Sequence, residues 1–137
     1  MELFECKSEQ ATMDLARKIG KESQPGDIIC LKGELGAGKT HFVKGFVTAF
    51  GIPQEAVSSP TFSIIQEYSG TVPIYHFDFY RLENVREALE IGSEEYFYGE
   101  GVSIIEWPER IEAILPDDVK QISIAAINNT TRQITIT

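Results

Sequence analysis

Residues 33–40 of this chain read G-E-L-G-A-G-K-T, which matches the phosphate-binding loop pattern G-x-x-x-x-G-K-[ST] at every fixed position. The glycines allow the backbone to fold tightly, so that successive N–H groups converge on phosphate oxygens. Lys39 supplies a cation for the β- and γ-phosphates, and the Thr40 hydroxyl can bind Mg²⁺. The stretch therefore predicts a nucleotide-binding loop and constrains the fold around it.

The sequence on either side of the loop supports this prediction. An apolar run at residues 27–31 indicates a buried strand before it, and residues 41–50 indicate a helix after it. This order places a bound phosphate at the N-terminus of the helix. The alternative is a glycine-rich turn between two elements, which leaves the Gly-Lys-Thr ending unexplained. The residues predicted to contact nucleotide here are Gly33, Glu34, Leu35, Gly36, Ala37, Gly38, Lys39 and Thr40.

The rest of the chain alternates between strand and helix patterns. Further strands are predicted at residues 4–7, 62–68, 72–80, 102–106, 121–127 and 132–137, and further helices at 9–22, 83–98 and 108–115, the second interrupted at Gly92. Residues 62–80 and 121–137 each form a predicted hairpin, which adds antiparallel pairs. We therefore expect an α/β fold: a single P-loop NTPase-like domain over residues 1–137, with a mixed parallel and antiparallel sheet flanked by helices.

A nucleotide–Mg²⁺ site also needs an acidic group at the end of a neighbouring strand. Glu106 directly follows the β-rich residues 102–105, which is the form of a Walker B strand. A carboxylate that leaves a buried strand is unusual, so we predict that Glu106 binds Mg²⁺ and acts in catalysis. The alternative is a charge that faces solvent at a strand end.

Asp78 is the second acidic candidate. Alternation along its strand puts His76, Asp78 and Tyr80 on one face, and aromatic residues on the other. A shared face for an imidazole, a carboxylate and a phenol suits metal binding or water positioning, and we assign Asp78 to the metal and catalytic residues. The pattern alone fits a polar outer face over an aromatic inner one equally well.

Two further residues are candidates for contact with the nucleotide. Thr61 follows Ser59-Pro60 in a predicted loop, where a hydroxyl could sense the γ-phosphate as switch loops do. Trp107 follows Glu106 directly and can pack against the nucleotide, contact a partner or fill the core. There is no Asn-Lys-x-Asp motif for guanine selection, so adenine is the expected base.

Composition excludes some classes of function. The formal net charge is −9, which argues against nucleic-acid binding by this domain alone, because basic patches are what bind the phosphate backbone. No run approaches the ~20 apolar residues of a membrane helix, and the first residues lack a signal-peptide layout. We therefore expect no membrane association and a cytoplasmic location. Cys6 and Cys30 have no metal-type spacing, and Cys30 is expected to be a small core residue.

Four motifs in this order resemble the TsaE family, the small bacterial P-loop ATPases of tRNA threonylcarbamoyladenosine (t6A) biosynthesis. They are residues 33–40, 59–62 (S-P-T-F), 76–82 (H-F-D-F-Y-R-L) and 106–108 (E-W-P), and the resemblance covers most of the chain. It implies a protein that binds ATP or ADP with Mg²⁺ and hydrolyses ATP slowly alone. It also implies action with the TsaB–TsaD pair, which modifies adenosine 37 of tRNAs that read ANN codons, with hydrolysis resetting that complex between turnovers.

The resemblance also implies roles for particular residues. Carried over by motif, Lys39 and the loop backbone hold phosphates, Thr40 and Glu106 hold Mg²⁺, and Asp78 supports metal or water. It places Thr61 in a switch-like loop and Trp107 beside the site, and it aligns Thr12 and Arg132 with positions that touch nucleotide. Two other functions stay open: a small-molecule kinase or phosphotransferase, and a scaffold that binds nucleotide without hydrolysis.

Overall fold

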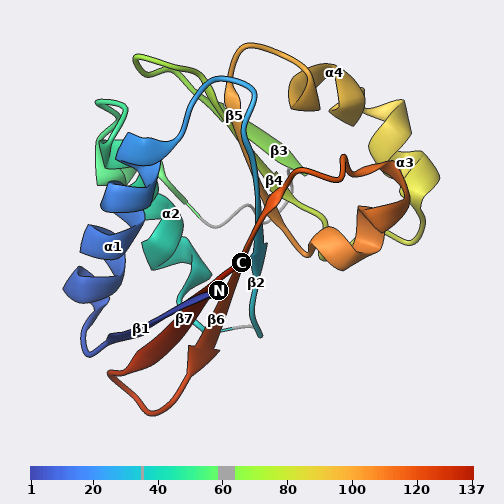
Figure 1. Ribbon diagram of the computed structural model, residues 1–137. Coiled ribbons are helices and arrows are strands. Elements are labelled where there is room, and N and C mark those ends of the chain that lie inside the picture. Colours follow the sequence, from blue (N-terminus) through green and yellow to red (C-terminus); the bar gives the residue numbers. More distant parts are fainter. Residues whose placement is uncertain (35, 59–63) are drawn as a thin grey trace.

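The computed structural model describes residues 1–34, 36–58 and 64–137. In this part of the chain a seven-stranded sheet has the order β1-β7-β6-β2-β5-β4-β3 (Figure 1). The strands are β1 (Glu2–Cys6), β2 (Ile28–Lys32), β3 (Ile65–Tyr68), β4 (Ile74–Asp78), β5 (Val102–Glu106), β6 (Lys120–Ala126) and β7 (Arg132–Ile136). The helices are α1 (Glu9–Glu22), α2 (Lys39–Thr48), α3 (Val85–Glu90) and α4 (Ser93–Phe97), with 3₁₀ turns η1 (Gln54–Ala56) and η2 (Pro108–Ile114).

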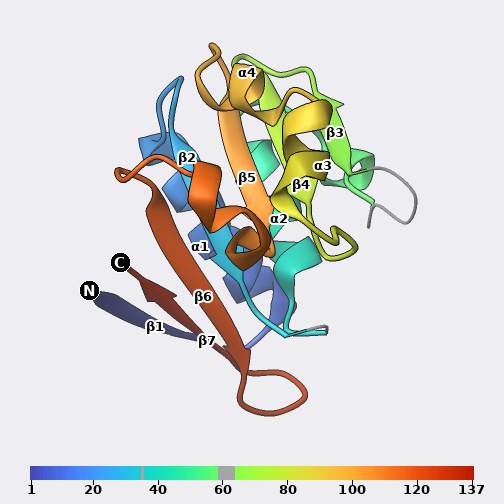
Figure 2. The ribbon, with the colours of Figure 1, turned by 90° about the vertical axis from the view of Figure 1, so that its right-hand side faces the viewer.

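The sheet is mixed, as predicted. Its four central strands, β6, β2, β5 and β4, are parallel, whereas β3 and the pair β7 and β1 are antiparallel to their neighbours. Both predicted hairpins are confirmed, as β3–β4 and β6–β7. The first and last strands lie side by side at one edge, which brings the two ends of the chain together (Figure 2).

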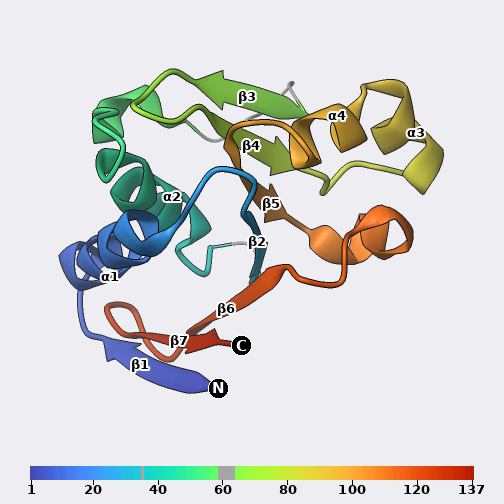
Figure 3. The same cartoon turned by 45° about the horizontal axis from the view of Figure 1, so that its top comes forward.

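Helices cover both faces of the sheet (Figure 3). One core lies under α1 and α2 and contains Phe42, Phe46 and Ile104, while the other lies under α3, α4 and η2 and contains Phe77 and Phe97. The alternation along β2, β4 and β5 divides their apolar side chains between these two cores. The prediction of a sheet flanked by helices is therefore confirmed.

The boundaries of several elements differ from the sequence prediction. The helix after the glycine loop begins at Lys39, not at residue 41, because Gly38 supplies a left-handed N-cap. Gly92, with φ 78°, splits the predicted helix 83–98 into α3 and α4. The segment after Pro108 is 3₁₀ rather than α-helix. Helix α1 has its predicted bounds because the Ser8 hydroxyl accepts a hydrogen bond from the Ala11 N–H at 3.0 Å.

Cys30 is confirmed as a core residue. It is fully buried in the core beneath α3, α4 and η2. Burial raises the pKa of its thiol to about 11, so the thiol stays protonated and unreactive at neutral pH.

Gly45 sets the distance between α1 and α2. A Cβ at this position would collide with the backbone of Met13 in α1. Gly45→Ala is therefore expected to lower the free energy of unfolding by about 1–3 kcal/mol, because the helices must separate. Denaturant unfolding measures this effect, with Lys44→Ala on the same helix as a control expected to change little. A gain in stability, as helix propensity alone predicts, would contradict this packing.

Candidate functional site

The glycine-rich loop runs from the end of β2 to the start of α2. Gly36 and Gly38 have φ values of 81° and 105°, a backbone region that other residues rarely adopt. A Cβ at Gly33 would lie 2.9 Å from the carbonyl oxygen of Ile124 in β6. The glycines therefore let the loop turn tightly against the sheet without side-chain bulk. Leu35, predicted to contact nucleotide, lies outside the described residues.

The remaining residues of the loop differ in their exposure. Glu34 is exposed, Ala37 is buried and Thr40, the second residue of α2, is half-buried. The Thr40 hydroxyl thus stands at the N-terminus of a ten-residue helix, where backbone N–H groups lack helical partners. Thr61 and its Ser59-Pro60 neighbours lie outside the described residues, so the switch-loop prediction stays a prediction.

Arg132, at the start of β7, holds the loop in place. Its Nε donates a hydrogen bond to the Ala37 carbonyl oxygen at 2.7 Å, and its Nη1 donates to the carbonyl oxygen of Asn128 at 2.8 Å. The guanidinium also packs on the backbone of Gly38, where a Cβ would lie 3.4 Å from Nε. The structure therefore brings this distant residue to the loop, although nothing around it in the sequence marked it.

Thr12 takes a different position. It lies in α1, is only 1% exposed, and its hydroxyl stands beside the Cys6 thiol. Cys6 is in register with Arg132 across β1 and β7, so Thr12 is a neighbour of the strand residue that pairs with Arg132. Its predicted contact with nucleotide stays a prediction, and its burial gives it an evident packing role.

The two predicted carboxylates meet at the ends of adjacent parallel strands. Glu106 ends β5, and its Cα is in register with Leu31 of β2 on one side and Asp78 of β4 on the other. Glu106 is 6% exposed, and Asp78 is half-buried. Burial raises the pKa of Asp78, and the nearby Glu106 adds to this, while a hydrogen bond from the Tyr80 N–H opposes it. Both acidic residues therefore lie at the carboxyl edge of the sheet, beside the glycine loop.

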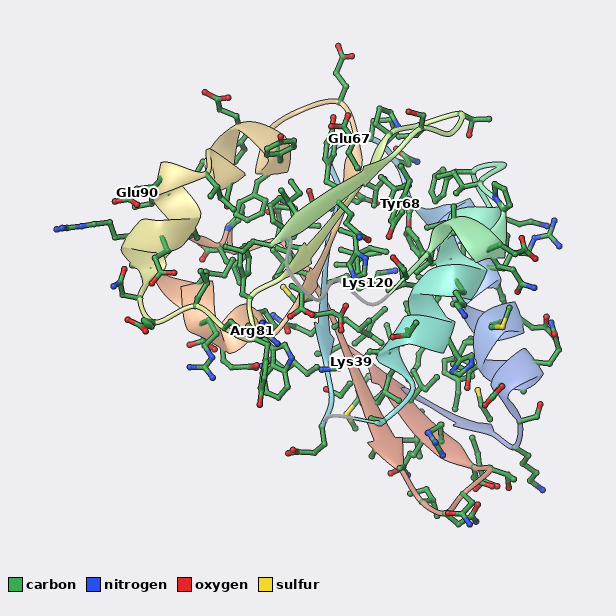
Figure 4. All side chains as sticks on the ribbon, turned by 180° about the vertical axis from the view of Figure 1, so that it is seen from behind. Lys39, Glu67, Tyr68, Arg81, Glu90 and Lys120 are labelled. Carbon is green, nitrogen blue, oxygen red and sulfur yellow. The ribbon has the colours of Figure 1, made fainter. Side chains whose placement is uncertain are left out.

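Lys39 is the first residue of α2 (Figure 4), and its ammonium reaches the Glu106 carboxylate. Its Nζ lies 3.9 Å from Glu106 Oε1 and 4.1 Å from the centroid of the Trp107 ring. Lys39 is 6% exposed, and among the described residues its Nζ has no hydrogen-bond partner. Burial lowers the pKa of Lys39, although the charges of Glu106 and Asp78 oppose this shift. The result is a buried cation that nearby carboxylates and an aromatic face compensate without a hydrogen bond from the described residues.

The sequence predicts that His76 shares a face with Asp78, but only Asp78 is assigned there to the metal and catalytic residues. In the structure His76 is 1% exposed, and its Nε2 lies 2.6 Å from Glu106 Oε2. The polar face of β4 is therefore buried at this point and does not face solvent. The available signal was the two-residue spacing between His76 and Asp78, which puts both side chains beside the end of β5.

Trp107 occupies a special backbone position directly after Glu106. Its φ of 59° is in the left-handed region, and it is the only non-glycine residue in the described ranges with a positive φ. This conformation turns the indole back over Lys39, and the ring packs on Tyr80 with centroids 5.0 Å apart. Such strain in a bulky residue is typical of functional sites.

A pocket of about 550 Å³ opens beside the loop. Its walls come from the first part of the loop, from Trp107 and Glu109, and from residues 123–126 at the end of β6. The site therefore combines a glycine-built loop, a buried cation, two carboxylates and an adjoining open pocket at the carboxyl ends of parallel strands. Ligands in open α/β sheets bind at this edge.

Fold and site together define an α/β protein whose glycine-rich loop joins a central parallel strand to a helix, the arrangement of phosphate-binding sites. The chain belongs to the TsaE family. The model of that family, described as "Threonylcarbamoyl adenosine biosynthesis protein TsaE", matches residues 6–134.

Individual relatives agree with this membership. The chain is 44% identical to the tRNA threonylcarbamoyladenosine biosynthesis protein TsaE of Bacillus subtilis, over 93% of this chain and 80% of the relative. It is 39% identical to that of Treponema pallidum, over 95% and 96%. A crystal structure of Bacillus subtilis YdiB superposes with a TM-score of 0.81 and 36% identity, over 98% of this chain and 83% of the other. The chain is thus a TsaE-family member by sequence and by fold.

Within the described ranges, no helix combines the length and the apolar character that crossing a bilayer requires.

Proposed function

We propose that this TsaE-family protein binds ATP with Mg²⁺ and hydrolyses it in support of a TsaB–TsaD pair. In this proposal the pair forms t6A at position 37 of tRNAs that read ANN codons. Hydrolysis resets the complex between turnovers and does not drive the transfer itself. The family's place in threonylcarbamoyladenosine biosynthesis supports the pathway, and the geometry around Lys39 supports the ATPase.

The observation that carries the proposal is the buried ammonium of Lys39. A cation that the fold desolvates without a hydrogen-bond partner among the described residues is costly, which suggests that a ligand supplies the missing partner. The glycines at positions 36 and 38 leave the adjacent backbone N–H groups free of side chains. A phosphate anion fits this donor set, because the cation and the helix N-terminus both attract negative charge.

The acidic residues fit Mg²⁺ in its usual partnership with phosphate. In the described part of the chain no three His, Cys, Asp or Glu side chains are grouped closely enough to hold a metal ion by themselves. Mg²⁺ commonly takes one or two protein oxygens and completes its shell with water and substrate phosphates. In our proposal Thr40 and Glu106 supply protein oxygens, and Asp78 binds the metal or orients water. The bound ion would neutralise charge on the phosphates.

The roles of the protein's own groups follow from their positions. Lys39 binds the phosphates, and Arg132 keeps the loop backbone in its binding shape through the Ala37 carbonyl. Trp107 shields Lys39 from water on one side. The net charge of −9 fits a protein that docks on a protein complex and does not grip tRNA by itself. The cytoplasmic location stays a prediction.

Phosphate release from ATP with Mg²⁺ tests the proposal, first for this protein alone and then with purified TsaB–TsaD. We expect slow release alone, stimulation by the pair, and loss of both in Lys39→Ala. Trp107 is the only tryptophan of the chain, so its fluorescence reports nucleotide binding separately from turnover.

Three other outcomes would contradict the proposal. Equal rates of phosphate release with and without TsaB–TsaD would show that the pair does not activate the ATPase. Nucleotide binding with no phosphate release under either condition would indicate a scaffold. Consumption of ATP with transfer of the phosphoryl group to a metabolite, and without release of inorganic phosphate, would indicate a phosphotransferase.

A further inference from the structure

The Glu106 carboxylate has two oxygens in different surroundings. Oε2 lies 2.6 Å from His76 Nε2, whereas Oε1 lies 3.9 Å from the Lys39 ammonium. An ion pair between buried partners would normally close to hydrogen-bond distance. The carboxylate instead makes its short contact with the imidazole, which leaves Oε1 and Lys39 apart.

His76 is itself held firmly. It lies in β4 between two strands, with its Cα in register with Gln66 of β3 and Ile104 of β5. Because a carboxylate only accepts hydrogen bonds, Nε2 is the donor to Glu106. On the other side of the ring, Nδ1 faces the Tyr68 hydroxyl at 3.4 Å, and that hydroxyl donates to Gln66 Oε1 at 2.5 Å. Figure 4 shows Tyr68 on β3, further along the sheet from Lys39.

We propose that His76 is a positioning residue that holds the Glu106 carboxylate away from Lys39. Its hydrogen bond to Oε2 leaves Oε1 as a metal ligand and keeps the ammonium available to phosphate. Without this hydrogen bond, Glu106 can turn towards Lys39 and close an ion pair with it. That pair would occupy the groups that the proposed Mg²⁺–ATP site requires. The inference rests on the proposed function, because it names what that site needs beyond its own ligands.

The arrangement follows a general property of metal sites. Groups that hydrogen-bond to a metal ligand orient it, and their loss typically costs about 10- to 100-fold in metal affinity or activity. His76 is such a group, because it hydrogen-bonds to Glu106 from inside the sheet. Neither of its ring nitrogens faces solvent. We therefore expect its effect to be transmitted through Glu106 alone.

The test measures the Mg²⁺ concentration that gives half of the Trp107 fluorescence response to ATP, together with phosphate release. His76→Phe keeps a ring but removes the donor, and we expect the half-saturating Mg²⁺ concentration to rise on the order of 10-fold or more. His76→Gln keeps an N–H donor on a flexible side chain, and we expect it to restore much of the native value. A purely structural role would not separate these two variants in this way.

Two controls separate positioning from loss of packing. Ile74→Ala removes buried volume from the same face of β4, two residues earlier, without touching Glu106. It is expected to lower the midpoint of thermal unfolding but to leave the Mg²⁺ requirement near its native value. In a Glu106→Gln background, adding His76→Phe should change the Mg²⁺ requirement by less than about threefold, because coupled residues are not additive.

Particular results would overturn the inference. Native Mg²⁺ dependence in His76→Phe, or an equal shift in Ile74→Ala, would leave His76 a packing residue while the proposed function stands. Full additivity with Glu106→Gln would show that His76 acts by another route. No response of the native protein to ATP with Mg²⁺ would overturn the proposed function, and this inference with it.

Discussion

Lys39→Ala is expected to reduce ATP turnover by about 10²-fold or more, with and without TsaB–TsaD. The substitution removes the buried ammonium beside Glu106 and Trp107, and loss of one transition-state contact commonly costs this much. Phosphate release at saturating ATP measures the effect. Lys44→Ala removes an equal charge from the same helix, away from the cluster, and is expected to stay near the native rate.

Removal of the Lys39 charge is expected to raise the stability of the protein, although it lowers turnover. Burial lowers the pKa of Lys39, so folding disfavours its charged form relative to the unfolded chain. Lys39→Met keeps much of the side-chain volume without the charge, and we expect it to raise the free energy of unfolding by about 1 kcal/mol. Gained stability with lost turnover would mark Lys39 as a residue kept for ligand binding. Native turnover in either variant would contradict the assignment of the loop.

Glu106→Gln is the second large effect, and it should separate metal binding from nucleotide binding. We expect ATP binding with Mg²⁺ to weaken on the order of 10- to 100-fold, while binding in the presence of EDTA is retained. The amide keeps the shape of the side chain and can still accept the hydrogen bond from His76, but it loses the charge that binds the metal. Titration of ATP with Trp107 fluorescence, with and without Mg²⁺, gives both affinities.

The outcome distinguishes two roles of Glu106. If both affinities fall equally, the residue supports the structure of the site and does not bind the ion. Asn84→Ala, which removes the N-cap of α3 on the other face of the sheet, serves as a control. It is expected to cost about 1 kcal/mol of stability without changing the Mg²⁺ requirement.

The local elements of the site were predictable because their signals are local. The apolar run before the loop, the glycines within it and the residues that lead into Glu106 each define their own conformation. Strand β5 accordingly has its predicted bounds, and α1 follows from its Ser8 cap. Family resemblance extended this to the pathway, because four motifs in order are more specific than one loop.

The errors in element boundaries are local, at residues 39, 92 and 108–114, whereas the omissions involve contacts between distant residues. No local pattern predicts that β2 lies between β5 and β6, because strand order depends on how the helices pack on both faces of the sheet. The hydrogen bond of Arg132 to the loop joins residues 95 positions apart. The short contact between His76 and Glu106 exists only because β4 and β5 are neighbours in register.

The amino-acid sequence by itself therefore determined the glycine loop, the carboxylate after β5 and the family, because neighbouring residues encode each of them. Only the tertiary structure decided that Lys39 is buried without a hydrogen-bond partner among the described residues, beside Trp107 and Glu106. It also decided that an imidazole from the next strand holds that carboxylate. The physical reason is that burial and desolvation come from the whole packed sheet, and no short segment of chain can specify them.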